Sequence, residues 1–470
     1  MRRTSTRIRY ALGDFIIASL CWMAFFFYRK SEIENVPLED WSLSLSDPKL
    51  ILGAILLPCF WSLSYLTLGA YKDIYRKSRV KEFVNTVIAV FLGSVFLFFT
   101  TITDDFFFNY SDLSISFIGL LGIHSIGFLI YRLIFISSTK KALSEGKVQF
   151  NTLIIGGYQK AVDLYQEIQE KSSYLGNNFV GFVQVNGIDT PLDKHLENLG
   201  TLESLDEIIE ELDIEEVIIA IESSEHDRLN EIIYDLVNKN LEIKIIPDIY
   251  DIVTGSVRVS NVLGTALIEV FPDLIPQWQK NVKRIFDILF ATVFLVILAP
   301  AYFFIAMRVK LSSSGPIFYL QERIGIHNKP FNIIKFRSMY TNAEKAGPAL
   351  SRDEDPRITK WGRVMRKWRL DELPQFYNVL KGDMSVVGPR PERQFYIDQI
   401  LPKAPHYKYL QKVRPGITSL GQVKYGYAEN VNQMIKRLKY DILYIENMSL
   451  VLDLKILYFT VHTLLGGKGK

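Results

Sequence analysis

Four long apolar runs in the first third of the chain restrict its fold more than any other feature. They cover residues 10–28, 50–70, 83–102 and 113–136. Each is long enough to cross a bilayer as a helix, which takes about 20 apolar residues. Backbone amides find no partner in lipid, so spans of this kind must be helical. The sequence therefore predicts a membrane protein with a four-helix transmembrane bundle over residues 1–137.

The charges that flank these runs predict their orientation. Arginines precede the first run, and Lys and Arg follow the second and fourth runs, whereas the other two loops carry Asp and Glu. Positive loops mark the cytoplasmic side of a membrane, so both ends of the bundle are expected there. The first run also resembles a signal peptide, but no small-residue cleavage site follows it and three more spans do.

Residues 138–275 predict an acidic α/β domain in the cytoplasm. They hold 10 Lys or Arg against 25 Asp or Glu, and strand candidates such as 152–155 and 216–221 alternate with helical stretches. This alternation is typical of a mainly parallel, Rossmann-like sheet. The dinucleotide fingerprint is incomplete, because Tyr158 stands where the second glycine should let the backbone approach a pyrophosphate. We therefore expect a docking or regulatory domain rather than an NAD site.

A fifth apolar run near residues 285–307 has basic residues on both flanks. The two basic flanks give no preference for sending either end across a membrane. Ala299 and Pro300 lie within the run, and an interior proline breaks or kinks a helix. A re-entrant helix over residues 283–308, entering and leaving the cytoplasmic leaflet, satisfies these observations. A kinked transmembrane helix is the alternative.

Residues 276–470 predict a basic domain, with 31 Lys or Arg against 15 Asp or Glu. Beside a membrane, this balance indicates anionic lipid or phosphate-bearing substrates as partners. No nucleic-acid motif accompanies the charge, so nucleic acid is not an expected partner. The two cysteines lie in apolar stretches and the six histidines are scattered, which disfavours disulfides and metal sites built on Cys or His.

The adjacent carboxylates Asp371 and Glu372 are the candidate centre of this domain. Pro374 is tolerated in the first turn of a helix and predicts a helix start, where free N–H groups favour an ionised Asp371. The surrounding cations are Lys335, Arg337, Arg366, Arg369, Arg390 and Arg393. This pattern suits either a helix cap in an ion-pair network or a nucleophile in a phosphate-binding pocket. A second carboxylate, with phosphate oxygens and water, suits Mg²⁺.

Several motifs in order resemble the bacterial sugar transferase family, the polyprenyl-phosphate phosphoglycosyl transferases. The motifs are KFRSM from Lys335, RLDELPQFYNVLKGDMS from Arg369, VGPRPE from Val387 and RPGIT from Arg414. The resemblance covers about residues 280–470, and the four apolar runs with a Rossmann-like segment match the layout of the family's long members. It implies an α/β catalytic domain over 276–470, in which Ala299-Pro300 matches the break of a re-entrant membrane helix.

The resemblance also implies a reaction. Asp371 would attack the sugar-linked phosphorus of a UDP-sugar, expel UMP and become a phosphosugar-aspartyl intermediate. Polyprenyl phosphate, in the form of undecaprenyl phosphate, would then accept the phosphosugar, and Glu372 would bind Mg²⁺. This would be the first membrane step of exopolysaccharide, capsule or O-antigen synthesis, at the cytoplasmic face of the bacterial inner membrane among membrane lipids. A homodimer is compatible with this organisation, although no residue specifies one.

Lys335, Arg366 and Arg390 align with family positions that bind phosphate or nucleotide, and Arg337 would support them. Arg393, Arg414 and Gln422 are further candidates for binding substrate or phosphate. After Gln422 and Val423 the chain continues with Lys424, where many members have an Asn/Ser-Gly-Arg sequence, so the sugar is left open.

Two other functions compete with this interpretation. A membrane-anchored nucleotide-sugar dehydratase or epimerase needs an intact glycine fingerprint and a Tyr-xxx-Lys pair. Here that spacing occurs at Tyr377 and Lys381, outside the Rossmann-like segment. A non-enzymatic scaffold with a dead transferase domain is the other alternative, and the intact Asp371-Glu372 pair argues against it.

Overall fold

The structure, a computed structural model, describes most of the chain. The described residues are 2–33, 45–102, 110–171, 176–185, 190–222, 226–237, 239, 241–246, 267–270, 274–343, 347, 350, 355–426 and 428–465. The chain divides into two compact units, one formed by Met1–Phe150 with Gln169–Asn178 and the other by Asn151–Ile168 with Phe179–Lys470.

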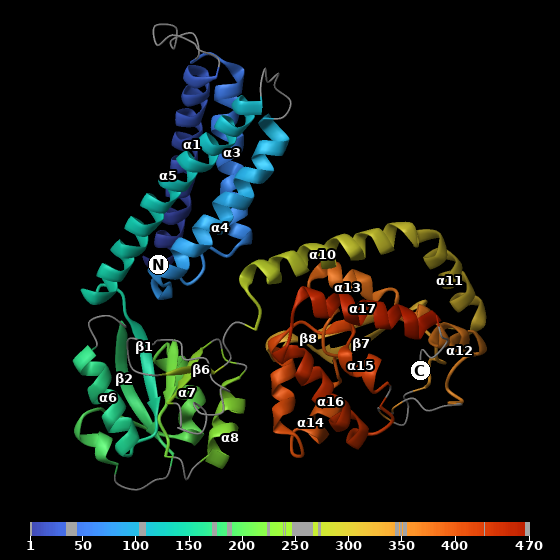
Figure 1. Cartoon of the computed structure of the whole chain (residues 1–470). Coiled ribbons are helices and arrows are strands. Elements are labelled where there is room, and N and C mark those ends of the chain that lie inside the picture. The colour runs from blue at the N-terminus through green and yellow to red at the C-terminus, as the bar shows by residue number, and fades with distance from the viewer. Residues whose placement is uncertain are drawn as a thin grey trace. The chain divides into compact units, whose positions relative to one another are not determined.

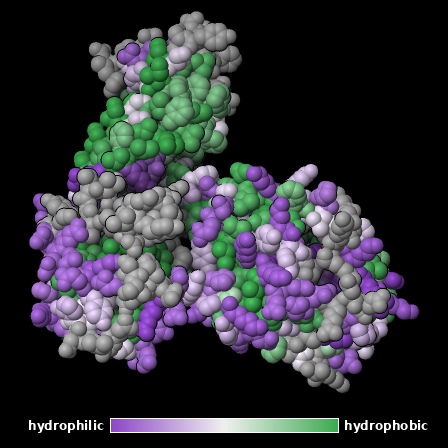
Figure 2. All heavy atoms as spheres, turned by 60° about the horizontal axis from the view of Figure 1, so that its bottom comes forward, coloured by the Kyte–Doolittle hydropathy of each residue, from purple (hydrophilic) through white to green (hydrophobic). Residues whose placement is uncertain are grey.

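The first unit contains the predicted membrane helices. They are α1 (Arg2–Glu32), α3 (Pro48–Thr67), α4 (Arg79–Leu97) and α5 (Tyr110–Ser144), in blue to cyan in Figure 1. Among the described residues, these four helices are long and apolar enough to cross a membrane one by one, as the sequence predicts. Apolar residues cover much of the visible face of this bundle (Figure 2), as expected of a surface that lipid solvates.

Charged side chains tie the bundle together internally. The buried guanidinium of Arg132 on α5 donates to Asp14 on α1 at 2.6 Å and to Glu82 on α4 at 2.8 Å. Lys77, just before α4, pairs with Glu82 at 2.9 Å. Two cations thus balance two carboxylates, which removes the cost of an unpaired charge inside a membrane helix bundle.

The acidic segment folds around a six-stranded sheet. Its strands are β1 (Phe150–Ile155), β2 (Asn177–Gln184), β3 (Asn198–Thr201), β4 (Glu216–Ile219), β5 (Glu242–Ile245) and β6 (Ile268–Val270). Their order is β3-β2-β1-β4-β5-β6, with the β1–β4, β2–β3 and β4–β5 pairs parallel and β6 antiparallel to β5. The predicted parallel α/β sheet is therefore confirmed, although the sequence patterns missed the short β3.

Helices α6 (Gln159–Lys171), α7 (Leu205–Glu211) and α8 (His226–Leu236) connect these strands (Figure 1). Buried β-branched and leucine residues from β1, β4, α7 and α8 form the core of this sheet domain. Apolar strands with amphipathic helices between them explain why the alternation was readable in the sequence.

The fifth apolar run forms two helices rather than one. Helix α10 (Gln277–Ile297) and helix α11 (Ala299–Ser312) meet at Leu298 with a bend of 64°. Pro300 lies in the first turn of α11, where its missing N–H leaves no helical hydrogen bond unmade. Local chemistry at Ala299-Pro300 therefore accounts for the position of the bend.

The C-terminal part packs around a main apolar core, and a smaller apolar cluster joins α11, β8 and the residues after them. An antiparallel hairpin, β7 (Phe318–Ile324) and β8 (Pro330–Phe336), precedes a series of short helices. These are α12 (Lys360–Lys367), α13 (Gln375–Lys381), α14 (Gln394–Ile400), α15 (Leu420–Lys424), α16 (Val431–Glu446) and α17 (Leu450–Leu465). Two short parallel strands, β9 (Ser385–Val387) and β10 (Gly416–Thr418), lie among them.

Candidate active site

The carboxylate pair lies on a single turn of 3-10 helix over Leu370–Glu372. Arg369, just before it, has a left-handed backbone with φ of 52°, which turns the chain sharply after α12. Pro374 follows as the residue that starts α13, close to the predicted helix start. Asp371 and Glu372 are buried, at 7% and 5% exposure. Two adjacent buried carboxylates need cationic partners to remain in such a place.

Glu372 has three cationic partners. Its Oε1 accepts from Lys335 of β8 at 3.0 Å and from Arg390 at 3.5 Å, and its Oε2 accepts from Arg369 at 3.3 Å. Burial alone would raise the pKa of Glu372, but Lys335, Arg390 and Arg369 outweigh it and hold that pKa well below its usual range. Glu372 is therefore a fixed negative charge inside a cationic ring.

The electrostatic surroundings of Asp371 differ from those of Glu372. Burial and the neighbouring Glu372 charge raise the pKa of Asp371, and Lys335 and Arg366 only partly oppose them. A buried carboxylate with a raised pKa is a stronger base and nucleophile once it has lost its proton. The pair thus combines one carboxylate that cations neutralise with one whose pKa is raised.

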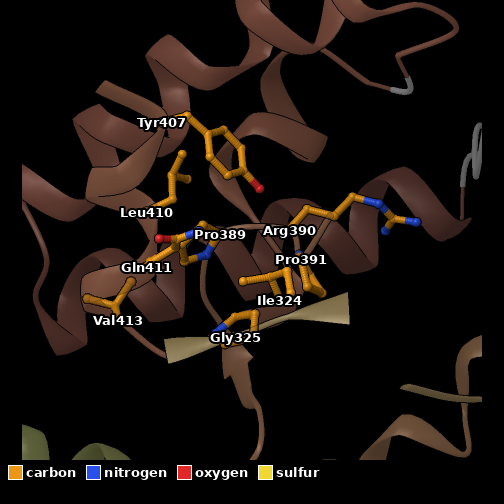
Figure 3. A pocket seen from close by; sticks show the side chains of 10 residues that line it. Ile324, Gly325, Pro389, Arg390, Pro391, Tyr407, Leu410, Gln411 and Val413 are labelled. Carbon is orange, nitrogen blue, oxygen red and sulfur yellow. The ribbon is translucent and has the colours of Figure 1, made fainter. Parts of the chain in front are cut away.

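Arg390 reaches Glu372 from a stiff loop. Figure 3 shows it between Pro389 and Pro391, beside a small pocket that Tyr407 also lines, with its guanidinium extending away from the other labelled side chains. Arg393 lies three residues further on and precedes α14.

Arg366 lies on α12, where its Nε donates to the Ser338 hydroxyl at 2.9 Å, and its charge acts to lower the pKa of Asp371. The structure thus brings Lys335, Arg366 and Arg390 to the carboxylate pair. Arg369 completes the ring around Glu372, although family matching had not assigned it a binding role. Its spacing three residues before Glu372 was the available signal.

Three other predicted site residues point elsewhere. Arg337, after the end of β8, donates to the Ser313 carbonyl at 2.6 Å and to its hydroxyl at 3.1 Å, at the C-terminal end of α11. Arg414 donates to the Gly382 carbonyl at 3.0 Å, just beyond α13. Gln422 is buried on α15, and within the described part of the chain neither side-chain amide atom has a hydrogen-bond partner.

Few residues here could hold a metal ion. Among the described residues, no group of three or more His, Cys, Asp or Glu side chains could do so. Glu372 already accepts from three cations, and a carboxylate offers about four lone-pair positions. This donor set fits a magnesium ion only if most of its ligands are phosphate oxygens and water, which is how Mg²⁺ is commonly bound.

The turn after β1 in the sheet domain carries the incomplete dinucleotide fingerprint. There the Glu222 carboxylate accepts from the Lys160 backbone N–H at 3.2 Å, at the start of α6. A Cβ on Gly157 would lie 2.5 Å from the Thr190 side chain, so the chain itself fills the space beside this turn.

Comparison with protein families gives two matches. Residues 278–467 match the model described as bacterial sugar transferase, and residues 70–247 match a model described as CoA-binding domain. A UDP-glucose:undecaprenyl-phosphate glucose-1-phosphate transferase of Escherichia coli K12 is 32% identical over 314 residues, which cover 65% of this chain and 68% of that protein. The chain belongs to the bacterial sugar transferase family.

Two more relatives support this membership. A UDP-N-acetylgalactosamine-undecaprenyl-phosphate N-acetylgalactosaminephosphotransferase of Aeromonas hydrophila is 42% identical over 224 residues, 48% of this chain and 52% of that protein. A UDP-glucose:undecaprenyl-phosphate glucose-1-phosphate transferase of Xanthomonas campestris is 33% identical over 321 residues, 65% of this chain and 66% of that protein. The relatives' names differ in their sugar, so family membership alone does not identify a sugar.

Proposed function

We propose that this protein transfers a sugar-1-phosphate from a UDP-sugar to undecaprenyl phosphate and releases UMP. The observation that carries the proposal is the buried pair in which cations neutralise Glu372 and leave Asp371 with a raised pKa. The names of the relatives support the two substrates. The product would start exopolysaccharide, capsule or O-antigen synthesis.

The proposed chemistry has two displacements at one phosphorus. The Asp371 carboxylate attacks the sugar-linked phosphorus, the bond from that phosphorus to the UMP oxygen breaks, and a phosphosugar-aspartyl intermediate forms. An oxygen of undecaprenyl phosphate then attacks the same phosphorus and releases Asp371 as a carboxylate. Lys335, Arg366 and Arg390 bind phosphoryl oxygens and neutralise their charge. Gln422, Arg393, Arg337 and Arg414 are proposed to support substrate binding from further out.

A magnesium ion on Glu372 and substrate phosphates would add positive charge near the phosphoryl oxygens. Glu372 itself holds Lys335 and Arg390 in the orientation from which they can contact these oxygens. Burial of both carboxylates keeps water away from Asp371, which protects an acyl phosphate from hydrolysis.

We further propose three domains, with boundaries near 1–137, 138–275 and 276–470, and a Rossmann-like middle domain. The sheet order β3-β2-β1-β4-β5 supports the last point. Basic residues precede the first membrane helix and follow the fourth, which supports a cytoplasmic active site at a bacterial inner membrane. The 64° bend at Leu298 supports a re-entrant α10–α11 pair, which would let a soluble UDP-sugar and a lipid phosphate meet at one surface.

UMP release tests the proposal. Purified protein in nanodiscs would receive undecaprenyl phosphate, Mg²⁺ and a panel of UDP-sugars, beside Asp371→Asn and a control, Asp398→Asn, whose carboxylate is exposed on α14. We expect turnover with one sugar, its loss in Asp371→Asn and its retention in the control. Without the lipid acceptor, a mass increase of one sugar phosphate on the Asp371 peptide is expected. Turnover that survives in Asp371→Asn would contradict the proposed nucleophile.

A further inference from the structure

The bent pair α10–α11 contacts both ends of the segment that carries the catalytic carboxylates. In Figure 1 the yellow α10 runs alongside α13, the helix that follows Asp371 and Glu372. At the near end of this segment, the Tyr302 hydroxyl of α11 donates to the Leu373 carbonyl at 2.7 Å. Leu373 is the residue directly after Glu372, so this hydrogen bond lies one residue from the reacting pair.

At the far end of this segment, the Arg284 guanidinium of α10 caps the C-terminal end of α13. Its Nη1 donates to the Val379 carbonyl at 2.7 Å and its Nη2 to the Leu380 carbonyl at 3.0 Å. The Val379 carbonyl also accepts from the Gly382 N–H at 3.1 Å, and the last carbonyls of a helix carry its negative dipole end, so a guanidinium is favoured there. Its planar, two-pronged geometry fixes α13 in position and not only in charge.

Between these two ends the contact is apolar. Phe294 of α10 stacks on Phe376 of α13, with ring centroids 5.0 Å apart. The same helix also holds β9, because Asp287 accepts from the Val386 N–H at 2.9 Å and Lys283 donates to the Val387 carbonyl at 2.9 Å. Because β9 leads directly into the loop of Arg390, the helix pair contacts both the segment that carries the carboxylates and the strand before the Arg390 loop.

We propose that Tyr302 and Arg284 are positioning residues. Their hydrogen bonds hold the segment 370–381 in a fixed position on the α10–α11 membrane pair, and so fix the Asp371 and Glu372 carboxylates for reaction. Neither side chain needs to touch substrate. The Leu373 carbonyl already accepts from the Phe376 N–H at 3.1 Å, and a carbonyl has two acceptor positions. Loss of the Tyr302 hydroxyl therefore leaves the helix start intact but removes the hydrogen bond between this turn and α11.

The catalytic part of this inference rests on the proposed function, so its test has two arms. The first is amide hydrogen exchange of the full chain in nanodiscs, which needs no turnover. Tyr302→Phe keeps the ring and removes only the hydroxyl. We expect exchange in residues 370–382 to rise about fivefold, the factor of one lost hydrogen bond, because local opening becomes easier. Tyr458→Phe, at an exposed position on α17, should leave this segment unchanged.

The second arm separates kcat from KM. With the sugar that gives turnover, Tyr302→Phe should lower kcat about five- to tenfold while KM for the UDP-sugar changes less than about twofold. Arg284→Lys keeps the positive charge but loses the pair of hydrogen bonds that a guanidinium can donate, and it should also lower kcat. Arg363→Lys, at an exposed position on α12, is its control. A purely structural role would instead lower the amount of folded protein and leave kcat per folded molecule unchanged.

The two hypotheses fail in different ways. If the wild type gives no UMP with any sugar, the proposed function fails, and the exchange arm still decides the positioning role. If the wild type turns over but Tyr302→Phe matches it in kcat and in exchange of residues 370–382, the positioning role is overturned. A folded Tyr302→Phe with a raised KM alone would also overturn it, since that result would indicate substrate contact instead.

Discussion

Replacing the buried Glu392 by glutamine is the substitution that we expect to be most informative about stability. The two oxygens of Glu392 bind two guanidiniums, Arg437 at 2.5 Å and Arg323 at 3.1 Å, and Glu392 is only 4% exposed. Its backbone carbonyl also accepts from the Ile324 N–H at 3.0 Å. These contacts hold the loop that precedes Glu392, from which Arg390 reaches the carboxylate pair.

The expected effect of Glu392→Gln follows from the loss of one charge between two cations. Removing one partner of a buried pair costs about 3–5 kcal/mol, because the other charge stays buried. Glutamine keeps one acceptor oxygen, so we expect the lower end, about 3 kcal/mol. In a domain of this size that lowers the unfolding temperature by about 6–12 °C.

The pH of the assay matters for this prediction. Burial would raise the pKa of Glu392, but Arg437 and Arg323 outweigh it and lower that pKa below its ordinary value of 4.5. A group of this kind contributes stability above its unfolded pKa and loses it as the pH falls through the lowered folded pKa. At neutral pH the full contribution is therefore present, and the two proteins should be compared there.

Thermal unfolding in nanodiscs would test the prediction, with Glu429→Gln as the control because that side chain is exposed. The double variant Glu392→Gln with Arg437→Met removes one carboxylate and one guanidinium. It should lose at least about 1 kcal/mol less than the sum of the two single variants. A shift no larger than that of the control, or strict additivity in the double variant, would refute the assignment of stability to this ion-pair cluster.

Two further predictions concern stability. Burial raises the pKa of Asp441 on α16 from 3.8 to about 6, so this carboxylate lowers stability as the pH rises through that range. The rise corresponds to roughly 3 kcal/mol, and Asp441→Asn should gain that much relative to the wild type between pH 4 and pH 8 in pH-dependent unfolding; parallel curves would contradict this. Gly315 has φ of 130°, and a Cβ there would lie 2.0 Å from Arg337 Nη1, so Gly315→Ala should cost about 1–3 kcal/mol in thermal unfolding. Gly347 also has a positive φ, and no atom of the described residues lies within 4 Å of a Cβ there, so it is the control. An equal loss in Gly347→Ala would assign the effect to backbone strain alone.

Properties carried by neighbouring residues were readable from the sequence. The four spans follow from the lengths of the apolar runs, and the parallel sheet follows from alternating strand and helix patterns. The bend at Leu298 falls where Ala299-Pro300 indicates a break. The short β3 escaped notice because Asn198–Thr201 holds a single apolar residue, Leu199, beside a glycine, so it shows neither an apolar run nor an alternating pattern.

The hydrogen-bond partners of the long cationic side chains could not be predicted from the sequence. Strand alternation places Lys335 and Arg337 on one face, yet Lys335 binds Glu372 whereas Arg337 caps the end of α11 at Ser313. Arg369, with no assigned binding role, joins the ring around Glu372. A flexible side chain with several donors binds whichever acceptor the fold brings within reach, and its sequence neighbours do not determine that acceptor.

The sequence by itself thus determined a membrane protein with an α/β segment and a carboxylate pair among cations. Each of these depends on residues close together in the chain. Only the tertiary structure decided that Glu372 is the neutralised carboxylate and Asp371 the one with a raised pKa. It also decided that Tyr302 and Arg284 donate hydrogen bonds to the carbonyls of Leu373 and Val379, in the segment that follows the carboxylate pair. Burial and charge pairing arise between elements distant in sequence, and these two quantities set the pKa of a carboxylate.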